Sequence, residues 1–244
     1  MSFTYQNEDE AAEGPRETRT VARPALPWFT IVLIAGYSVV FIVQLVTGLD
    51  RSAVVAGDDK DAVRNGHEIW RMLTGSALHG SIIHYAMNTY AFYSFGRIFE
   101  MLSNRAHVAI VFLLSAIAGA ILSQVVNPHG ISVGASGGIV GLVGYLAVYS
   151  FKRRALISSQ FRNNLIVNIG IILFYGLILS VNVDNSAHIG GLICGAVYAL
   201  IQVPSDSYVD PTTASSITET LGITSIGIYI ATCGFCILLM LGIV

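Results

Sequence analysis

Long runs of apolar residues, separated by short polar connections, dominate the hydrophobic pattern of this chain. A helix needs about 20 apolar residues to cross a bilayer core about 30 Å thick. Seven stretches reach or approach that length: 28–49, 81–101, 106–126, 135–151, 164–181, 186–203 and 222–243. The pattern therefore predicts an all-α membrane protein that crosses the bilayer seven times.

The fourth stretch, 135–151, differs from the others because it is short and rich in glycine. Irregular backbone is tolerated inside a membrane where protein surrounds it, but not where lipid does. We therefore expect this stretch to lie at the centre of the helix bundle, with the longer stretches around it.

The connections between the stretches predict sidedness, because short cytoplasmic connections carry most of the Lys and Arg residues. If every stretch crosses once, the Arg residues before the first stretch, Arg105 and the basic run within 152–162 share one side. The connections 127–134 and 182–185 on the other side carry no Lys or Arg. The connection 50–71 is the exception, since it mixes basic with acidic residues. The balance predicts a cytoplasmic N-terminus and an external C-terminus.

The composition agrees with a protein whose main partner is the lipid bilayer. Of the 244 residues, 54% are hydrophobic and 11% are charged, and the mean hydropathy is +0.67. Soluble domains carry roughly 25% charged residues. The net charge of −2, without a basic face, argues against a nucleic-acid partner. Residues 1–26 are polar and acidic, which predicts a disordered cytoplasmic tail and no cleavable signal peptide.

Polar side chains with chemical potential lie near the outer ends of the second, fourth and sixth stretches. They are His84 with Asn88, then Ser136, then His188. All three stretches begin at the same face, so the three clusters occupy the same layer of the bilayer. An ionisable residue inside a span is costly and by default marks function.

These residue types suit acyl transfer. A serine becomes a nucleophile when a base lies at roughly 3 Å, and His188 is the candidate base for Ser136. His84 and Asn88 are four residues apart, on one helix face, and both can donate to a developing oxyanion. Each feature taken alone also fits a structural role: a packing serine, a histidine bound to a carbonyl, and a polar pair that links helices.

Glycines at four-residue spacing accompany the serine and the histidine. Gly137 and Gly141 lie on the fourth stretch, and Gly191 and Gly195 lie on the sixth. Small residues at this spacing let two helix backbones approach closely. We expect the fourth and sixth helices to pack at these glycines, with Gly144 deeper and off the contact.

Together these motifs resemble the rhomboid family of intramembrane serine proteases. The family's marks are G-x-S-G on its fourth core helix, A-H-x-x-G-x-x-x-G on its sixth and H-x-x-x-N on its second. The Trp70-Arg71 pair resembles the W-R pair of the family's first external loop, and Glu100 fits a structural acid at the inner end of the second helix. The matching segments here are GASGG at 134–138, AHIGGLICG at 187–195 and HYAMN at 84–88.

The resemblance implies a domain organisation. A rhomboid-like six-helix transmembrane bundle, the protease core, would occupy 27–203. A linker at 204–221 would connect it to one additional C-terminal transmembrane helix within 222–244. The protein would lie in the cell membrane, with its active site open to the external side.

The resemblance also implies roles for the candidate residues. Ser136 would be the nucleophile and His188 the general base of a dyad that works without an acid. His84, Asn88 and the Ser136 amide would stabilise the oxyanion. The substrates would be membrane proteins, each cut near the outer end of a transmembrane segment. Neither a metal nor another cofactor is implied.

Two features depart from that pattern or stand outside it. Family members often carry an aromatic residue one turn after the serine, where this chain has Val140. Valine can pack against an imidazole but offers no ring face. Cys233 and Cys236 form a C-x-x-C motif inside the last stretch, which we interpret as apolar packing rather than a redox or metal site.

Two other functions stay open at this point. A catalytically inactive relative would bind transmembrane segments without cutting them, although such proteins are marked by loss of Ser136 or His188, and both are present here. A small-solute transporter would use the same polar groups at the midplane of the membrane. Transporters often show internal repeats, and we find none in this sequence.

Overall fold

The computed structural model describes residues 26–178, 183–206 and 208–244, so most of the predicted N-terminal tail lies outside the described residues. The described chain is almost entirely helical. Its long helices are α1 (Trp28–Thr47), α5 (Ile82–Leu102), α6 (Arg105–Val126), α7 (Ser136–Lys152), α8 (Ser159–Ile178), α9 (Asn185–Gln202) and α10 (Ser216–Leu241).

Each of the seven predicted stretches coincides with one of these helices. The helix ends agree within a few residues, except that α8 and α10 begin earlier than the expected 164 and 222. Of the described helices, α1, α6 and α10 are long and apolar enough to cross a membrane. Of the others, α7 is 17 residues long, and α5 and α9 carry polar candidate site residues.

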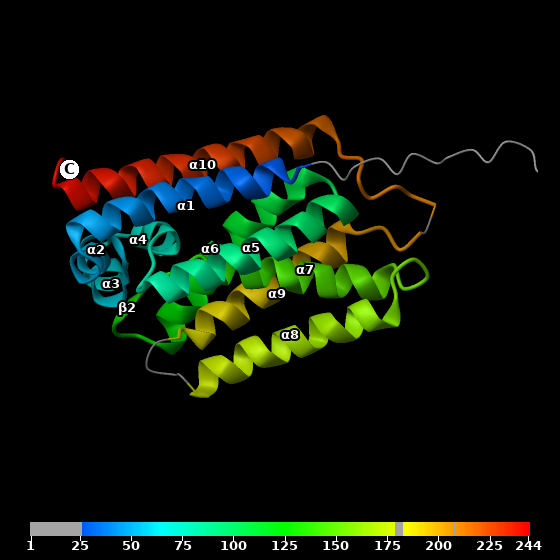
Figure 1. Ribbon diagram of the computed structural model, residues 1–244, viewed down its shortest axis with the longest axis horizontal. Coiled ribbons are helices and arrows are strands. Elements are labelled where there is room, and N and C mark those ends of the chain that lie inside the picture. Colours follow the sequence, from blue (N-terminus) through cyan, green and yellow to red (C-terminus); the bar gives the residue numbers. More distant parts are fainter. Residues whose placement is uncertain (1–25, 179–182, 207) are drawn as a thin grey trace, which may run out of the picture.

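The helices are arranged around a buried centre, as Figure 1 shows. α1 and α10 run side by side along one face, and α8 lies along the opposite edge. α7 lies between them and is buried over most of its length, in contact with α6 and α9. The prediction that the glycine-rich helix is central is therefore confirmed.

Stacked aromatic rings fill the core between these helices. Phe92 of α5 stacks on Phe112 of α6 with ring centroids 4.6 Å apart, and Phe99 stacks on Tyr145 of α7 at 4.1 Å. Tyr229 of α10 meets Phe112 edge-on at 5.0 Å. Aromatic pairs at these separations add to the stabilisation that burial alone provides. α10 is thus packed against the other helices rather than loosely attached.

Glycines form the contact between α7 and α9. A Cβ atom on Gly191 would lie 2.0 Å from the carbonyl oxygen of Gly137, and one on Gly195 would lie 1.9 Å from that of Gly141. The two backbones therefore touch, as the spacing predicts. The expectation for Gly144 is wrong, because its Cβ would lie 2.4 Å from a carbonyl oxygen of α9. Positions i, i+4 and i+7 share one helix face, which places all three α7 glycines on the contact.

The connection between α1 and α5 folds into small elements that hydrophobic periodicity did not predict. They are α2 (Leu49–Ala56), β1 (Asp58–Asp59), α3 (Lys60–Gly66), α4 (Arg71–Thr74) and the 3₁₀ helix η1 (Gly75–Ala77). β1 pairs antiparallel with β2 (Ile131–Ser132), which precedes α7, and Asp58 lies opposite Ser132. These elements gather at one end of the bundle, where the C-terminus also lies (Figure 1). The connection thus braces the entry to α7.

Two of the motif residues quoted above have structural partners. Glu100 Oε1 accepts hydrogen bonds from the backbone N–H of Thr30 at 2.8 Å and from its hydroxyl at 2.7 Å. Thr30 lies in the first turn of α1, so Glu100 caps that helix from α5. Arg71 donates to the carbonyl oxygens of Val54 at 3.0 Å and Gly57 at 3.1 Å, which holds the connection together.

Candidate functional site

Ser136 and His188 meet at the same end of the bundle. Ser136 is the first residue of α7, and His188 lies in the first turn of α9. The Nε2 atom of His188 is 2.9 Å from the Ser136 hydroxyl oxygen, which is hydrogen-bonding distance. His188 is 8% exposed and Ser136 is half-buried. The fold thus brings together a hydroxyl and an imidazole that are 52 residues apart in the chain.

The backbone before Ser136 requires glycine. Gly134 has φ of +135°, a conformation that side chains disfavour. Its N–H donates to the carbonyl oxygen of Gly75 at 2.9 Å, so the connection between α1 and α5 fixes this turn. The turn leaves Ser136 at the N-terminus of α7, where backbone N–H groups are free to bind a negative charge.

His84 lies next to the same turn. A Cβ on Gly134 would lie 2.9 Å from His84 Nε2 and 3.6 Å from the Ser136 hydroxyl, so glycine keeps open a space that both groups border. The Gly80 N–H lies 3.5 Å from His84 Nδ1, which can accept its hydrogen bond. A neutral imidazole that accepts at Nδ1 carries its proton at Nε2 and can donate it towards that space.

Asn88 lies one turn after His84 on α5 and is 6% exposed. Within the described parts of the chain, its side-chain Nδ2 has no hydrogen-bond partner. A buried amide donor without a partner costs free energy, and such groups call for an explanation. A ligand oxygen that arrives during a reaction would provide one.

His79 lies five residues before His84, where we expect from the sequence a supporting residue next to the site, and the structure places it behind His84. Its ring is fully buried and meets the His84 ring edge-on, with centroids 5.3 Å apart. Gln44 of α1 holds its backbone: the His79 N–H donates to Gln44 Oε1 at 2.9 Å, and Gln44 Nε2 donates to the His79 carbonyl at 3.2 Å. The short spacing to His84 was the sequence signal for this packing.

Asp184 was not expected at the site, because it lies in the connection before α9 and not within a span. Asp184 precedes α9 and caps it: the carboxylate accepts from the Ala187 N–H at 3.0 Å, and the backbone carbonyl accepts from the His188 N–H at 3.2 Å. The signal was present in the sequence, since an Asp directly before a helix is a strong N-cap.

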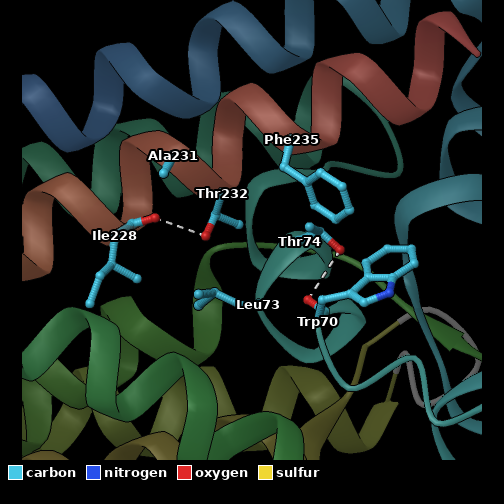
Figure 2. Close-up of a pocket in the computed structure, with 7 residues that line it drawn as sticks. All are labelled: Trp70, Leu73, Thr74, Ile228, Ala231, Thr232 and Phe235. Atoms are coloured by element: carbon cyan, nitrogen blue, oxygen red, sulfur yellow. Dashed lines mark hydrogen bonds between the residues drawn. The ribbon is translucent and has the colours of Figure 1, made fainter. Parts of the chain in front are cut away.

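A separate apolar cavity of about 360 Å³ lies between α4 and α10. Figure 2 shows Trp70, which directly precedes α4, next to Phe235 of α10. Their rings meet edge-on with centroids 5.3 Å apart. None of the polar site residues lines it. Across the described residues, no three His, Cys, Asp or Glu side chains converge as metal ligands would. The lining residues are Trp70, Leu73, Thr74, Ile228, Ala231, Thr232 and Phe235.

The comparison with known proteins identifies the class. Residues 66–205, more than half of the chain, match the Rhomboid domain. The chain therefore belongs to the rhomboid family, a family that includes proteases, and it is a multi-pass membrane protein. The resemblance that the three motifs predicted is confirmed.

Individual relatives support the same assignment. The chain is 36% identical to Rhomboid protease GluP of Bacillus subtilis (strain 168) over 172 residues. This matched segment covers 69% of this chain and 34% of that protein. The chain is 35% identical over 145 residues to the mitochondrial RHOMBOID-like protein 6 of Arabidopsis thaliana, covering 56% and 45%. It is 30% identical over 149 residues to Rhomboid-like protease 5 of Toxoplasma gondii, covering 60% and 18%. The matched segment thus spans less than half the length of these relatives.

Proposed function

We propose that this protein is an intramembrane serine endopeptidase that cuts transmembrane segments of other membrane proteins near their outer ends. The observation that carries the proposal is the 2.9 Å approach of His188 Nε2 to the Ser136 hydroxyl. A serine next to a base, at a helix N-terminus and beside spare hydrogen-bond donors, is the arrangement that acyl transfer requires.

The reaction follows from the protonation of the two groups. Ser136 Oγ attacks the carbonyl carbon of the scissile peptide while His188 Nε2 takes the hydroxyl proton. The tetrahedral intermediate collapses, the C–N bond breaks, and His188 returns the proton to the leaving amine. Water, activated by the same imidazole, then hydrolyses the ester on Ser136 and regenerates the free hydroxyl.

The oxyanion of the intermediate would lie in the space that Gly134 keeps open. His84 Nε2 borders that space, the Ser136 amide belongs to the N-terminus of α7, and Asn88 Nδ2 is buried with no other partner among the described residues. Donors that are already in place stabilise the developing charge without reorganisation. This accounts for the Asn88 Nδ2 group, which has no hydrogen-bond partner among the residues that the structure describes.

The proposal includes an architecture and an orientation. α1, α5, α6, α7, α8 and α9 would form a six-helix protease core, and α10 would be an additional transmembrane helix after a linker. The end of the bundle that carries α2 to α4 would face outward from the cell membrane. The basic connection between α7 and α8 supports this sidedness, because it lies at the other end (Figure 1).

The test uses the purified protein in detergent, a serine-directed fluorophosphonate probe and a co-reconstituted substrate with one transmembrane segment. Because Ser136 and His188 act as one unit, Ser136→Ala and His188→Ala each abolish labelling and cleavage, and the double variant is no worse. Ser225→Ala on α10 and His129→Ala in an exposed connection are the matched controls and keep wild-type activity.

Two results would contradict the proposal. Cleavage by the His188→Ala variant at the wild-type rate would remove the base from the mechanism. A wild-type protein that binds the substrate segment but neither cuts it nor reacts with the probe would instead be an inactive member of the family.

A further inference from the structure

A second side-chain pair lies outside the Ser136–His188 pair, just before α7 and α9 begin. Ser132 precedes Ser136 by four residues, and Asp184 precedes His188 by four residues. The Ser132 hydroxyl donates to Asp184 Oδ2 at 2.6 Å. The two chain segments that carry the site are therefore linked twice, once at the site and once outside both helices.

Asp184 gathers several donors at this second link. Its carboxylate accepts from the Ala187 N–H at the start of α9, from Asn127 Nδ2 at 3.2 Å and from the Ser123 hydroxyl at the end of α6. The Lys60 ammonium lies 3.9 Å from Asp184 Oδ2. A single carboxylate thus joins α6, α9 and the connection between α1 and α5.

The same contacts keep Asp184 ionised. Burial alone would raise the pKa of this carboxyl, but the hydrogen bonds from Ser123, Ser132 and the Ala187 N–H, with the charge of Lys60, hold the pKa below its usual value. The charged form that these donors require is therefore the form present at neutral pH.

Lys60 is the buried cation of the network. Its side chain is 1% exposed and pairs with the Asp58 carboxylate, whose other oxygen accepts from Gln124 Nε2 at 2.8 Å. Asp58 lies opposite Ser132 in the β1–β2 pair. A buried ion pair is weak support for stability, since desolvation offsets its attraction, but a buried polar network can specify one arrangement of the chain.

We infer that Lys60, Ser132 and Asp184, here called the outer clamp, position the first turn of α9 against the entry to α7 and so set the distance between His188 and Ser136. The inference rests on the proposed protease function. The three are positioning residues, because none of them contacts the Ser136–His188 pair with its side chain.

The glycine contact begins beside the site, where Gly137 directly follows Ser136, and continues away from the clamp. Gly191 and Gly195 fix the separation of α7 and α9 beyond His188, whereas the first turn of a helix has unpaired N–H groups and frays when its cap is removed. His188 lies between these two fixed regions, and its own N–H bonds the Asp184 carbonyl. Loss of the clamp would therefore displace the imidazole without opening the bundle.

The experiment measures kcat and KM for cleavage at a temperature well below the Tm of every variant. The Tm of each variant is measured separately. Asp184→Ala lowers kcat about 10²-fold with KM unchanged, since a misplacement of about 1 Å can cost that much in rate. Asp184→Asn keeps an oxygen for the Ala187 N–H but loses the acceptor for the Ser132 hydroxyl and the charge beside Lys60, so it recovers only part of the kcat. Ser132→Ala loses less than Asp184→Ala. Asp61→Ala is the matched control, because this exposed acid of the same connection pairs only with His129 among the described residues.

Several outcomes would overturn the clamp. They are an unchanged kcat in Asp184→Ala and Ser132→Ala, a loss confined to KM, or a wild-type kcat in Asp184→Asn. If Asp184→Ala does not fold, Ser132→Ala and Asp184→Asn decide the question.

The failure of the proposed function would be recognised separately, because the wild-type protein itself would then neither cut nor label. In that case the readout is the NMR signal of the His188 ring nitrogens in the intact protein. The clamp predicts that this signal shifts in Ser132→Ala and stays in place in Asp61→Ala. An unshifted His188 signal in Ser132→Ala would overturn the clamp.

Discussion

Replacing Gly195 with alanine tests whether the backbone contact between α7 and α9 sets the geometry of the site. Gly195 lies two turns beyond His188 and contacts no proposed site residue. Its added Cβ would lie 1.9 Å from the carbonyl oxygen of Gly141, whereas ordinary contacts begin at 3.4 Å. The neighbour is backbone and cannot rotate away. α9 must therefore move outward by up to 1.5 Å at this point.

The displacement of His188 depends on whether α9 pivots or shifts as a whole. Along α9, His188 lies four residues and Gly195 eleven residues beyond the cap at Asp184. Because a helix rises by a constant 1.5 Å per residue, the distances of these residues from the cap are in the same ratio. If α9 pivots about the outer clamp, His188 moves about a third as far as Gly195, or roughly 0.5 Å. If α9 shifts as a whole, His188 moves the full distance. In both cases the 2.9 Å contact with Ser136 lengthens beyond good hydrogen-bonding distance.

We expect Gly195→Ala to slow both probe labelling and substrate cleavage by about 10- to 100-fold, given the cost of a displacement near 1 Å. Overpacking should also lower the stability by about 1–3 kcal/mol. Labelling rates and melting temperatures in detergent measure the two effects. Gly234→Ala on α10 is the matched control, because no described atom lies within 4 Å of its Cβ and alanine favours a helix.

A Gly195→Ala protein that labels, cleaves and melts like the wild type would refute the reasoning. It would mean that α9 accommodates a methyl group without moving His188, and that the glycines at this contact serve some other purpose. If the stability falls but the labelling rate does not, the glycine contact only packs α7 against α9. The outer clamp alone would then position His188.

Two further predictions concern α5. Asn88→Ala should lower kcat by about 10²–10³-fold with little change in KM, because the amide stabilises charge that develops only during the reaction. Steady-state kinetics on a transmembrane substrate measures both constants. Weakened binding with an unchanged kcat would make Asn88 a helix-packing residue instead. Glu100→Ala leaves the Thr30 N–H and hydroxyl without their acceptor and should therefore lower the stability by about 1–3 kcal/mol. The folded fraction should keep its kcat. A melting temperature equal to that of the wild type would show that this cap contributes nothing to stability.

The sequence alone determined the seven long helices and the identity of the candidate residues. Apolar length and glycine content are local properties, and the bilayer turns length directly into a spanning helix. The four-residue spacing of Gly137 with Gly141, and of Gly191 with Gly195, likewise specified a close contact, because helix geometry places such positions on one face. For the same reason the sequence could have placed Gly144 on that contact.

Only the tertiary structure decided how these helices meet. The 2.9 Å contact between Ser136 and His188 depends on the separation of two helices, and local spacing does not set that separation. Lys60 and Asp58 lie in a connection whose sequence shows only a mixture of basic and acidic residues, yet the folded chain buries them near Asp184, more than 120 residues further along. A buried charge is tolerable where opposite charges and hydrogen bonds surround it, and only the folded chain brings those partners together.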